Sequence, residues 1–245
     1  MLISFAICLH DEKDYIIDLL RRINAAKVEY TYEIIILDDN SSPDTINAIH
    51  ATSLANDIIT RKHTGNYAEQ KNFLNGLCNG DYIVNLDADE YLQETFLFSI
   101  EDILVSNPSI ELYFLPRINI VRGITHRYIA EYGWHITQVE GYRETEHLAQ
   151  TSDEYQVLKD YNLITDEEDG WVTYNQPIIQ WPDWQGRIYK NSSHIKWEGK
   201  VHEKIIGAKA FTTFPAEPLY AIHHIKDIKR QVTQNITYTQ LQKEG

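Results

Sequence analysis

The first half of the sequence alternates short apolar runs with segments of helical periodicity, and this alternation limits the fold more than any other feature. The apolar runs are nearly unbroken, as expected of strands covered on both faces, and they occupy residues 2–9, 33–37, 58–59 and 82–86. Helical spacing separates them at residues 14–23, 45–55 and 67–77. Strands and helices that alternate in this way predict βαβ units, a parallel sheet and right-handed crossovers.

Acidic and polar residues follow three of these four strands. In an open parallel sheet, ligands bind at the edge where the carboxyl ends of the strands meet. Each cluster alone also fits a turn or a helix N-cap. Three clusters at one edge repel one another, however, and therefore require a cation or hydrogen-bond donors, and hard oxygen ligands on alternate residues favour Mg²⁺ or Mn²⁺. The clusters are His10-Asp11-Glu12, Asp38-Asp39-Asn40 and Asp87-Ala88-Asp89.

The order and spacing of these segments resemble the nucleotide-sugar-binding half of family-2 glycosyltransferases, which have the GT-A fold. The similarity covers residues 1–115 and is carried by "ISFAICLHDE", "YEIIILDDNSSPDT" and "NYAEQKNFLNGLCNGDYIVNLDADEYL". The last segment contains the Asp-x-Asp signature at Asp87 and Asp89, with "KN" at Lys71-Asn72 in the helix before it. Asp-x-Asp alone is weak evidence, but the ordered set is specific.

The second half resembles, more loosely, the bacterial lipopolysaccharide-core and peptide-glycosylating branch of the same family. The matching segments are "WPDWQGRIYKN", "WEGKVHEKI" and "YAIHHIKD". Residues 122–169 between the halves match nothing in that branch, and we expect acceptor specificity to reside there. No repeat or linker divides the chain, so we expect one domain over residues 1–245.

The resemblance implies an α/β fold of the GT-A, Rossmann-like type, with a mixed, mainly parallel sheet flanked by helices. Residues 1–115 would form the nucleotide-sugar-binding half. Residues 116–245 would form a β-rich and irregular acceptor-binding half.

For the donor, the resemblance implies that Asp39 contacts the uracil or ribose of a UDP-sugar, while Asp38 serves equally well as a helix cap. It makes Asp89 a direct ligand of Mn²⁺ or Mg²⁺, with Asp87 on the ribose or a metal-bound water, and a late histidine, His223 rather than His224, completing the metal shell. Glu90 is expected to face away, because neighbouring side chains diverge. The candidate nucleotide-sugar residues are Asp11, Asp38, Asp39, Lys71, Asp87 and Asp89.

Sugar transfer needs a base against the acceptor hydroxyl, whose pKa lies far above neutrality. Glu203 in "VHEK" is the first candidate and Asp183 in "WPDW" the second. The alternatives are that Glu203 pairs with Arg187 and that Asp183 caps a turn. Trp181, Trp184 and His202 are candidate acceptor contacts, although aromatic residues are more often core.

Composition narrows the functional classes. The formal net charge of −14 is unfavourable for a protein held on nucleic acid, so a modified DNA base, as in a phage enzyme, is a disfavoured acceptor and a glycan the favoured one. Two cysteines without CxxC spacing predict reduced thiols and a cytoplasmic enzyme. No apolar run has the length of a membrane span.

Two other functions remain open. A sugar-nucleotide nucleotidyltransferase uses a related sheet but would carry a glycine-rich loop after the first strand, where this chain has "LHDEKDY". A non-catalytic sugar-binding module would not need the Asp-x-Asp and Val-His-Glu motifs. We therefore favour a metal-dependent glycosyltransferase, which the family resemblance implies to be inverting.

Overall fold

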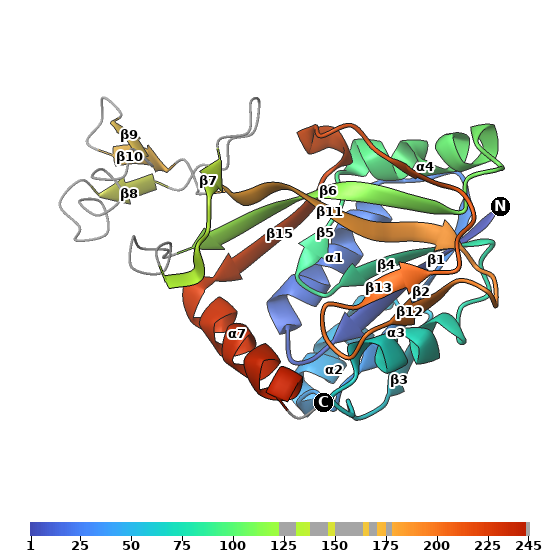
Figure 1. Cartoon of the computed structure of the whole chain (residues 1–245), viewed down its shortest axis with the longest axis horizontal. Coiled ribbons are helices and arrows are strands. Elements are labelled where there is room, and N and C mark those ends of the chain that lie inside the picture. Colours follow the sequence, from blue (N-terminus) through green and yellow to red (C-terminus); the bar gives the residue numbers. More distant parts are fainter. Residues whose placement is uncertain (123–130, 138–146, 150–163, 167–170, 175–177, 244–245) are drawn as a thin grey trace.

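The computed structural model describes residues 1–122, 131–137, 147–149, 164–166, 171–174 and 178–243 (Figure 1). The stretch 122–169, where we expect acceptor specificity, lies largely outside these residues. The first half contains β1 (Leu2–Leu9), α1 (Lys13–Ala25), β2 (Thr31–Asp38), α2 (Pro43–Thr52), β3 (Asp57–Thr60), α3 (Tyr67–Asn75), β4 (Tyr82–Asp87), β5 (Glu90–Tyr91) and α4 (Glu94–Ser106). The second half contains β6 (Leu112–Arg122), β7 (Ile136–Thr137), β8 (His147–Ala149), β9 (Ile164–Asp166), β10 (Trp171–Tyr174), β11 (Ile178–Lys190), β12 (Lys196–Glu198), β13 (Lys204–Ile206), β14 (Phe211–Thr213), the 3₁₀ turn η1 (Pro218–Tyr220), β15 (Ile222–Asp227) and α7 (Ile228–Lys243).

Ten of the described strands form one mixed sheet. Its main order is β3-β2-β1-β4-β11-β6-β15-β5, with β14 added at β6 and β7 at β11. Strands β1 to β4 run parallel, and Cys8 of β1 lies beside both Leu37 of β2 and Asp87 of β4. The carboxyl ends of these three strands therefore reach the same edge, as the alternating pattern predicted.

Helices cover both faces of the sheet, which explains why the strands are apolar throughout. Helix α1 buries Ile16, Leu19, Leu20 and Ile23 against the sheet. Two helices begin at side-chain caps: Ser42 accepts from the Thr45 N–H at α2, and Asn66 accepts from the Glu69 N–H at α3. These caps fix where the loops at the carboxyl edge end.

The second half is built onto the same sheet. Strand β11 runs antiparallel between β4 and β6, and β15 runs parallel to β6. The short β12–β13 hairpin is pinned to α3, because the Asn72 side chain exchanges two hydrogen bonds of 2.8 Å with the Trp197 backbone. Figure 1 shows α7 running from the end of β15 toward the carboxyl edge of β1 and β2.

No helix in the described ranges combines the length and the apolarity that a membrane crossing requires.

Candidate active site

Two cavities meet at the carboxyl edge of the sheet. The edge pocket, of about 650 Å³, is lined by the ends of β1, β2 and β4 together with α3 and α7. The sheet pocket, of about 740 Å³, lies over β6, β11 and β15 and under the turn before β13. The two cavities share a wall, which consists of Lys71, Asp87, Glu203, Lys226 and Gln234.

A run of alternating charges lies beside this wall. Its centre is Glu90, whose side chain has no exposed surface and lies 3.1 Å from Arg117 and 2.7 Å from Arg187. Beyond Arg117 the next charge is Asp183, with 2.6 Å between Arg117 Nη2 and Asp183 Oδ2. Beyond Arg187 it is Asp87, with 3.0 Å between Arg187 Nη2 and Asp87 Oδ2. Glu90 was expected to face away; its carboxylate lines neither of the two pockets and is buried against two arginines from β6 and β11.

Lys71 of α3 extends this run of charges to Glu203. Its ammonium lies 3.6 Å from Asp87 and 2.8 Å from Glu203, over the face of Trp197. Burial raises the pKa of both carboxyls, but the neighbouring cations together hold each pKa below its ordinary value: Lys71 at Glu203, and Lys71 with Arg187 at Asp87. Glu203 therefore pairs with Lys71, and Arg187 pairs with Asp87 and Glu90 instead.

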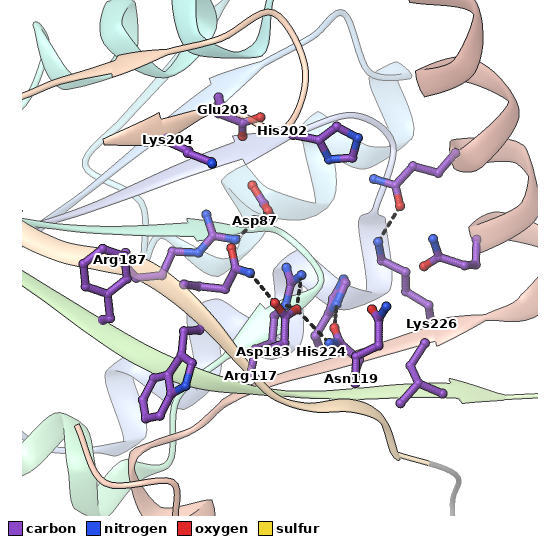
Figure 2. A pocket seen from close by; sticks show the side chains of 18 of the residues that line it. Asp87, Arg117, Asn119, Asp183, Arg187, His202, Glu203, Lys204, His224 and Lys226 are labelled. Carbon is purple, nitrogen blue, oxygen red and sulfur yellow. Dashed lines mark hydrogen bonds and ion pairs between the residues drawn. The ribbon is translucent and has the colours of Figure 1, made fainter. Parts of the chain in front are cut away.

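Asp183 is surrounded by donors. Its Oδ2 atom accepts from Arg117 at 2.6 and 2.9 Å and from Asn119 at 2.9 Å, and its Oδ1 atom accepts from Gln185 at 2.8 Å (Figure 2). Burial raises its pKa, but Arg117 and the hydrogen bonds outweigh burial and lower it. Both oxygens are thus engaged within the protein.

Asn119 links Asp183 to His224 through two hydrogen bonds. Because the Asn119 amide nitrogen donates to Asp183, its oxygen must face His224 Nδ1, 2.8 Å away. Nδ1 therefore carries the proton, and the lone pair of Nε2 faces Asp89 Oδ2 at 3.4 Å. Burial and then the nearby Lys226 lower the pKa of His224, which keeps the ring neutral.

His223 lies on the other face of β15. Its ring stacks on Tyr91 with centroids 4.8 Å apart, and its Nε2 lies 3.3 Å from the Pro218 carbonyl oxygen. The structure therefore does not bring His223 to Asp89 and places its neighbour His224 there. Successive side chains of a strand point to opposite faces, so only one of two adjacent histidines reaches the edge.

Asp89 and His224 fit a divalent cation. No group of three or more His, Cys, Asp or Glu side chains is arranged for a metal within the described ranges. Two ligands that each lie ~2.1 Å from one Mg²⁺-like ion are about 3 Å apart, close to the 3.4 Å between Asp89 Oδ2 and His224 Nε2. The proton on Nδ1 leaves Nε2 available as a ligand, and further ligands would come from water or substrate.

The other acidic strand ends have separate roles. Asp39 lines the edge pocket and accepts from the His63 N–H at 2.6 Å. Asp38 is buried and accepts from the Ser41 N–H at 2.9 Å, so it shapes the turn before α2, but the cap of that helix is Ser42 and the capping alternative was wrong. Asp11 is exposed and accepts from the Ser42 N–H at 2.7 Å, which fixes the start of α2 and leaves Asp11 outside the described lining.

The three candidate acceptor contacts also differ in whether they line a pocket. Trp184, 38% exposed, and His202 line the sheet pocket. Trp181 instead packs, partly buried, against a cluster of isoleucines. Trp134 and Trp197 also line the sheet pocket.

The polar residues of the three strands under the sheet pocket share a signal that would also have identified those the sequence analysis did not name. They occupy alternate positions within apolar strands, and the pairing brings them together: Arg117 lies beside Asp183, and Asn119 lies beside His224. A period of two that places polar side chains on one face of a buried strand indicates a polar cavity. The positions are Arg117 and Asn119 on β6, Asp183, Gln185 and Arg187 on β11, and His224 and Lys226 on β15.

Comparisons with known proteins agree with this architecture. The family model described as glycosyl transferase family 2 matches residues 4–180. An uncharacterized glycosyltransferase of Rickettsia prowazekii is 35% identical over 89 residues, which are 36% of this chain and 29% of that protein. An undecaprenyl-phosphate 4-deoxy-4-formamido-L-arabinose transferase of Pseudomonas fluorescens is 29% identical over 93 residues, which are 36% of this chain and 27% of that protein. The chain thus spans less than a third of the length of these curated relatives.

A solved structure shows the same fold over most of the chain. Residues 1–349 of S. aureus TarS, solved with UDP-GlcNAc, superpose with a TM-score of 0.55 at 13% identity. The superposition covers 92% of this chain and 59% of that one. The family match, which spans more than half of the residues, and the shared fold lead to one assignment: the chain belongs to glycosyl transferase family 2 and has the GT-A fold.

Proposed function

We propose that the chain is a metal-dependent, inverting glycosyltransferase that moves a sugar from a nucleoside diphosphate sugar, by preference a UDP-sugar, to a hydroxyl of a glycan. The observation that carries the proposal is the wall shared by the two pockets, because a transferase must bring a donor and an acceptor together at one point. A carboxylate, Glu203, and an ammonium group, Lys226, stand on that wall.

The edge pocket is the proposed donor site. Asp39 would bind the nucleoside, and the diphosphate would lie toward Asp89 and His224. These two residues would hold Mn²⁺ or Mg²⁺, which supplies positive charge to the departing diphosphate. The complex of TarS with UDP-GlcNAc supports a UDP-sugar as the donor to test first.

The sheet pocket is the proposed acceptor site, with Trp184 as a platform for a sugar ring. Glu203 is the better candidate for the base. Its carboxylate has one cationic partner, Lys71, whereas Asp183 has both oxygens engaged by protein donors. Inversion by direct displacement would require Glu203 to take the acceptor proton on the side of the sugar away from the diphosphate.

We further propose that residues 1–245 work as one domain in the cytoplasm. The continuous sheet that joins both halves supports the first statement. The free thiols of Cys8 and Cys78 support the second, because reduced cysteines are typical of a reducing compartment.

Release of UDP from a panel of UDP-sugars, measured with Mn²⁺ and again with EDTA, tests this proposal. Glu203→Gln should lower the rate of release by about 10²–10⁴-fold, the range for a lost general base, and leave donor affinity unchanged. Glu198→Gln, at an exposed position of β12, is the matched control. Donor binding without turnover would indicate a sugar-binding module, and formation of a UDP-sugar from UTP and a sugar phosphate would indicate a nucleotidyltransferase.

A further inference from the structure

Lys226 is a buried cation without a carboxylate partner. Only 6% of its surface is exposed, and no carboxylate oxygen in the described part of the chain lies within 4.0 Å of its ammonium group. Its hydrogen bond goes instead to the neutral amide oxygen of Gln234 on α7, at 2.6 Å. Asp89, which lies beyond that distance, compensates the charge of Lys226 only in part. Because burying an incompletely paired charge is costly, this position favours the binding of an anion beside it.

The position of Lys226 indicates which anion this is. Lys226 stands on the wall shared by the two pockets and points from the same face of β15 as His224, two residues earlier (Figure 2). The other cation of that wall, Lys71, is already neutralised by Glu203 and Asp87. Among the described residues of the wall, Lys226 therefore has the positive charge that is still available to a ligand.

Helix α7 holds this arrangement in place. Arg230 lies 2.6 Å from Glu12 and 3.3 Å from Asp89, which anchors the first turns of α7 at the carboxyl edge. Gln234 follows four residues later, so it faces the same side of the helix as Arg230. The amide of Gln234 thereby orients the lysine without neutralising it.

On the basis of the proposed function, we propose that Lys226 binds the diphosphate of the donor and stabilises it as the leaving group, with Gln234 as a positioning residue. The bond between the anomeric carbon and the phosphate oxygen breaks, and its electron pair stays on that oxygen beside the Lys226 ammonium. The new bond joins the anomeric carbon to the acceptor oxygen, whose proton passes to Glu203. Lys226 remains protonated throughout.

Binding of UDP, UMP and uridine, measured by calorimetry with Mn²⁺ present, tests the assignment. Lys226→Gln should weaken UDP about 10- to 100-fold, the range for a lost hydrogen bond to a charged group, while uridine changes less than about twofold. Lys226→Arg should restore much of the UDP affinity. Lys229→Gln removes the same charge from an exposed neighbour and should bind all three probes as the wild type does.

Gln234→Glu provides a second test that keeps the lysine. The new carboxylate would neutralise Lys226 internally and should weaken UDP relative to uridine. If the wild type binds UDP and either Lys226→Gln or Gln234→Glu binds it equally well, the role of Lys226 is overturned while the proposed function stands. If the wild type binds no nucleoside diphosphate from a panel of UDP, GDP, CDP and ADP, the proposed function fails and this inference fails with it.

Discussion

Replacing Glu90 by glutamine should destabilise the whole protein, although the two side chains have the same shape. Glu90 Oε1 accepts from Arg117 and Arg187, and Oε2 accepts from the Asp87 N–H at 3.1 Å. The amide keeps one acceptor but removes the charge shared by two buried guanidinium groups, and its NH₂ group cannot accept from Asp87. Breaking a buried ion pair costs about 3–5 kcal/mol. For a chain of this size, that predicts a Tm lower by about 6–20 °C.

Unfolding by heat and by urea, followed by circular dichroism, measures this loss. Glu94→Gln is the matched control, because Glu94 is exposed at the start of α4 and an exposed substitution changes stability by less than about 0.5 kcal/mol. If Glu90→Gln unfolds within about 1 kcal/mol of the wild type, the two arginines do not depend on Glu90. The run of charges described above would then have no structural role.

Three further predictions concern the edge of the sheet. His224→Ala should abolish the gain in UDP affinity that Mn²⁺ provides, whereas His223→Ala should lower Tm and leave that gain intact; calorimetry with and without Mn²⁺ separates the two. Asp183→Ala should also reduce the gain, because Asn119 loses the acceptor that orients it toward His224; an effect on turnover alone would instead make Asp183 the base. The pKa values of Glu203 and Asp183 are lowered by folding, so their contribution to stability is complete above the ordinary carboxyl pKa and is lost as pH falls through the folded values. The share of the free energy of unfolding that depends on Glu203, measured in urea as the difference between the wild type and Glu203→Gln, should thus be steady from about pH 7 to 5 and decline below about pH 4.

The donor half was predictable because its signals are local. Apolar runs, helical spacing and turn residues all lie within short windows, and each strand ends where a polar cluster begins. Asp39, Asp87 and Asp89 were accordingly placed at the pocket edge by their position after a strand. The same local pattern does not distinguish them from Asp11 and Asp38, whose carboxylates shape the α2 loop. That difference depends on where the folded backbone places each carboxylate relative to the pocket.

The second half depends on contacts between distant residues. Whether Asp183 is a base or a buried anchor depends on Arg117, which is 66 residues away in the chain. The choice between His223 and His224 depends on the register of β15 against β6, and a shift of one residue would exchange their faces. Strand β11 enters the sheet beside β4 through pairs such as Ile188 with Val84, and no local pattern specifies that neighbour.

The pairing of β6 with β11 makes the stretch between them exchangeable. Ile120, near the end of β6, lies directly beside Ile178, the first residue of β11, so residues 123–177 connect two neighbouring strands, and within them β7 pairs with β11. Replacing those 55 residues by a turn of about five changes the loop-closure free energy by only about 2 kcal/mol. Evolution could therefore replace this excursion with another of different length and chemistry while the register, the run of charges and the proposed donor pocket stay as they are.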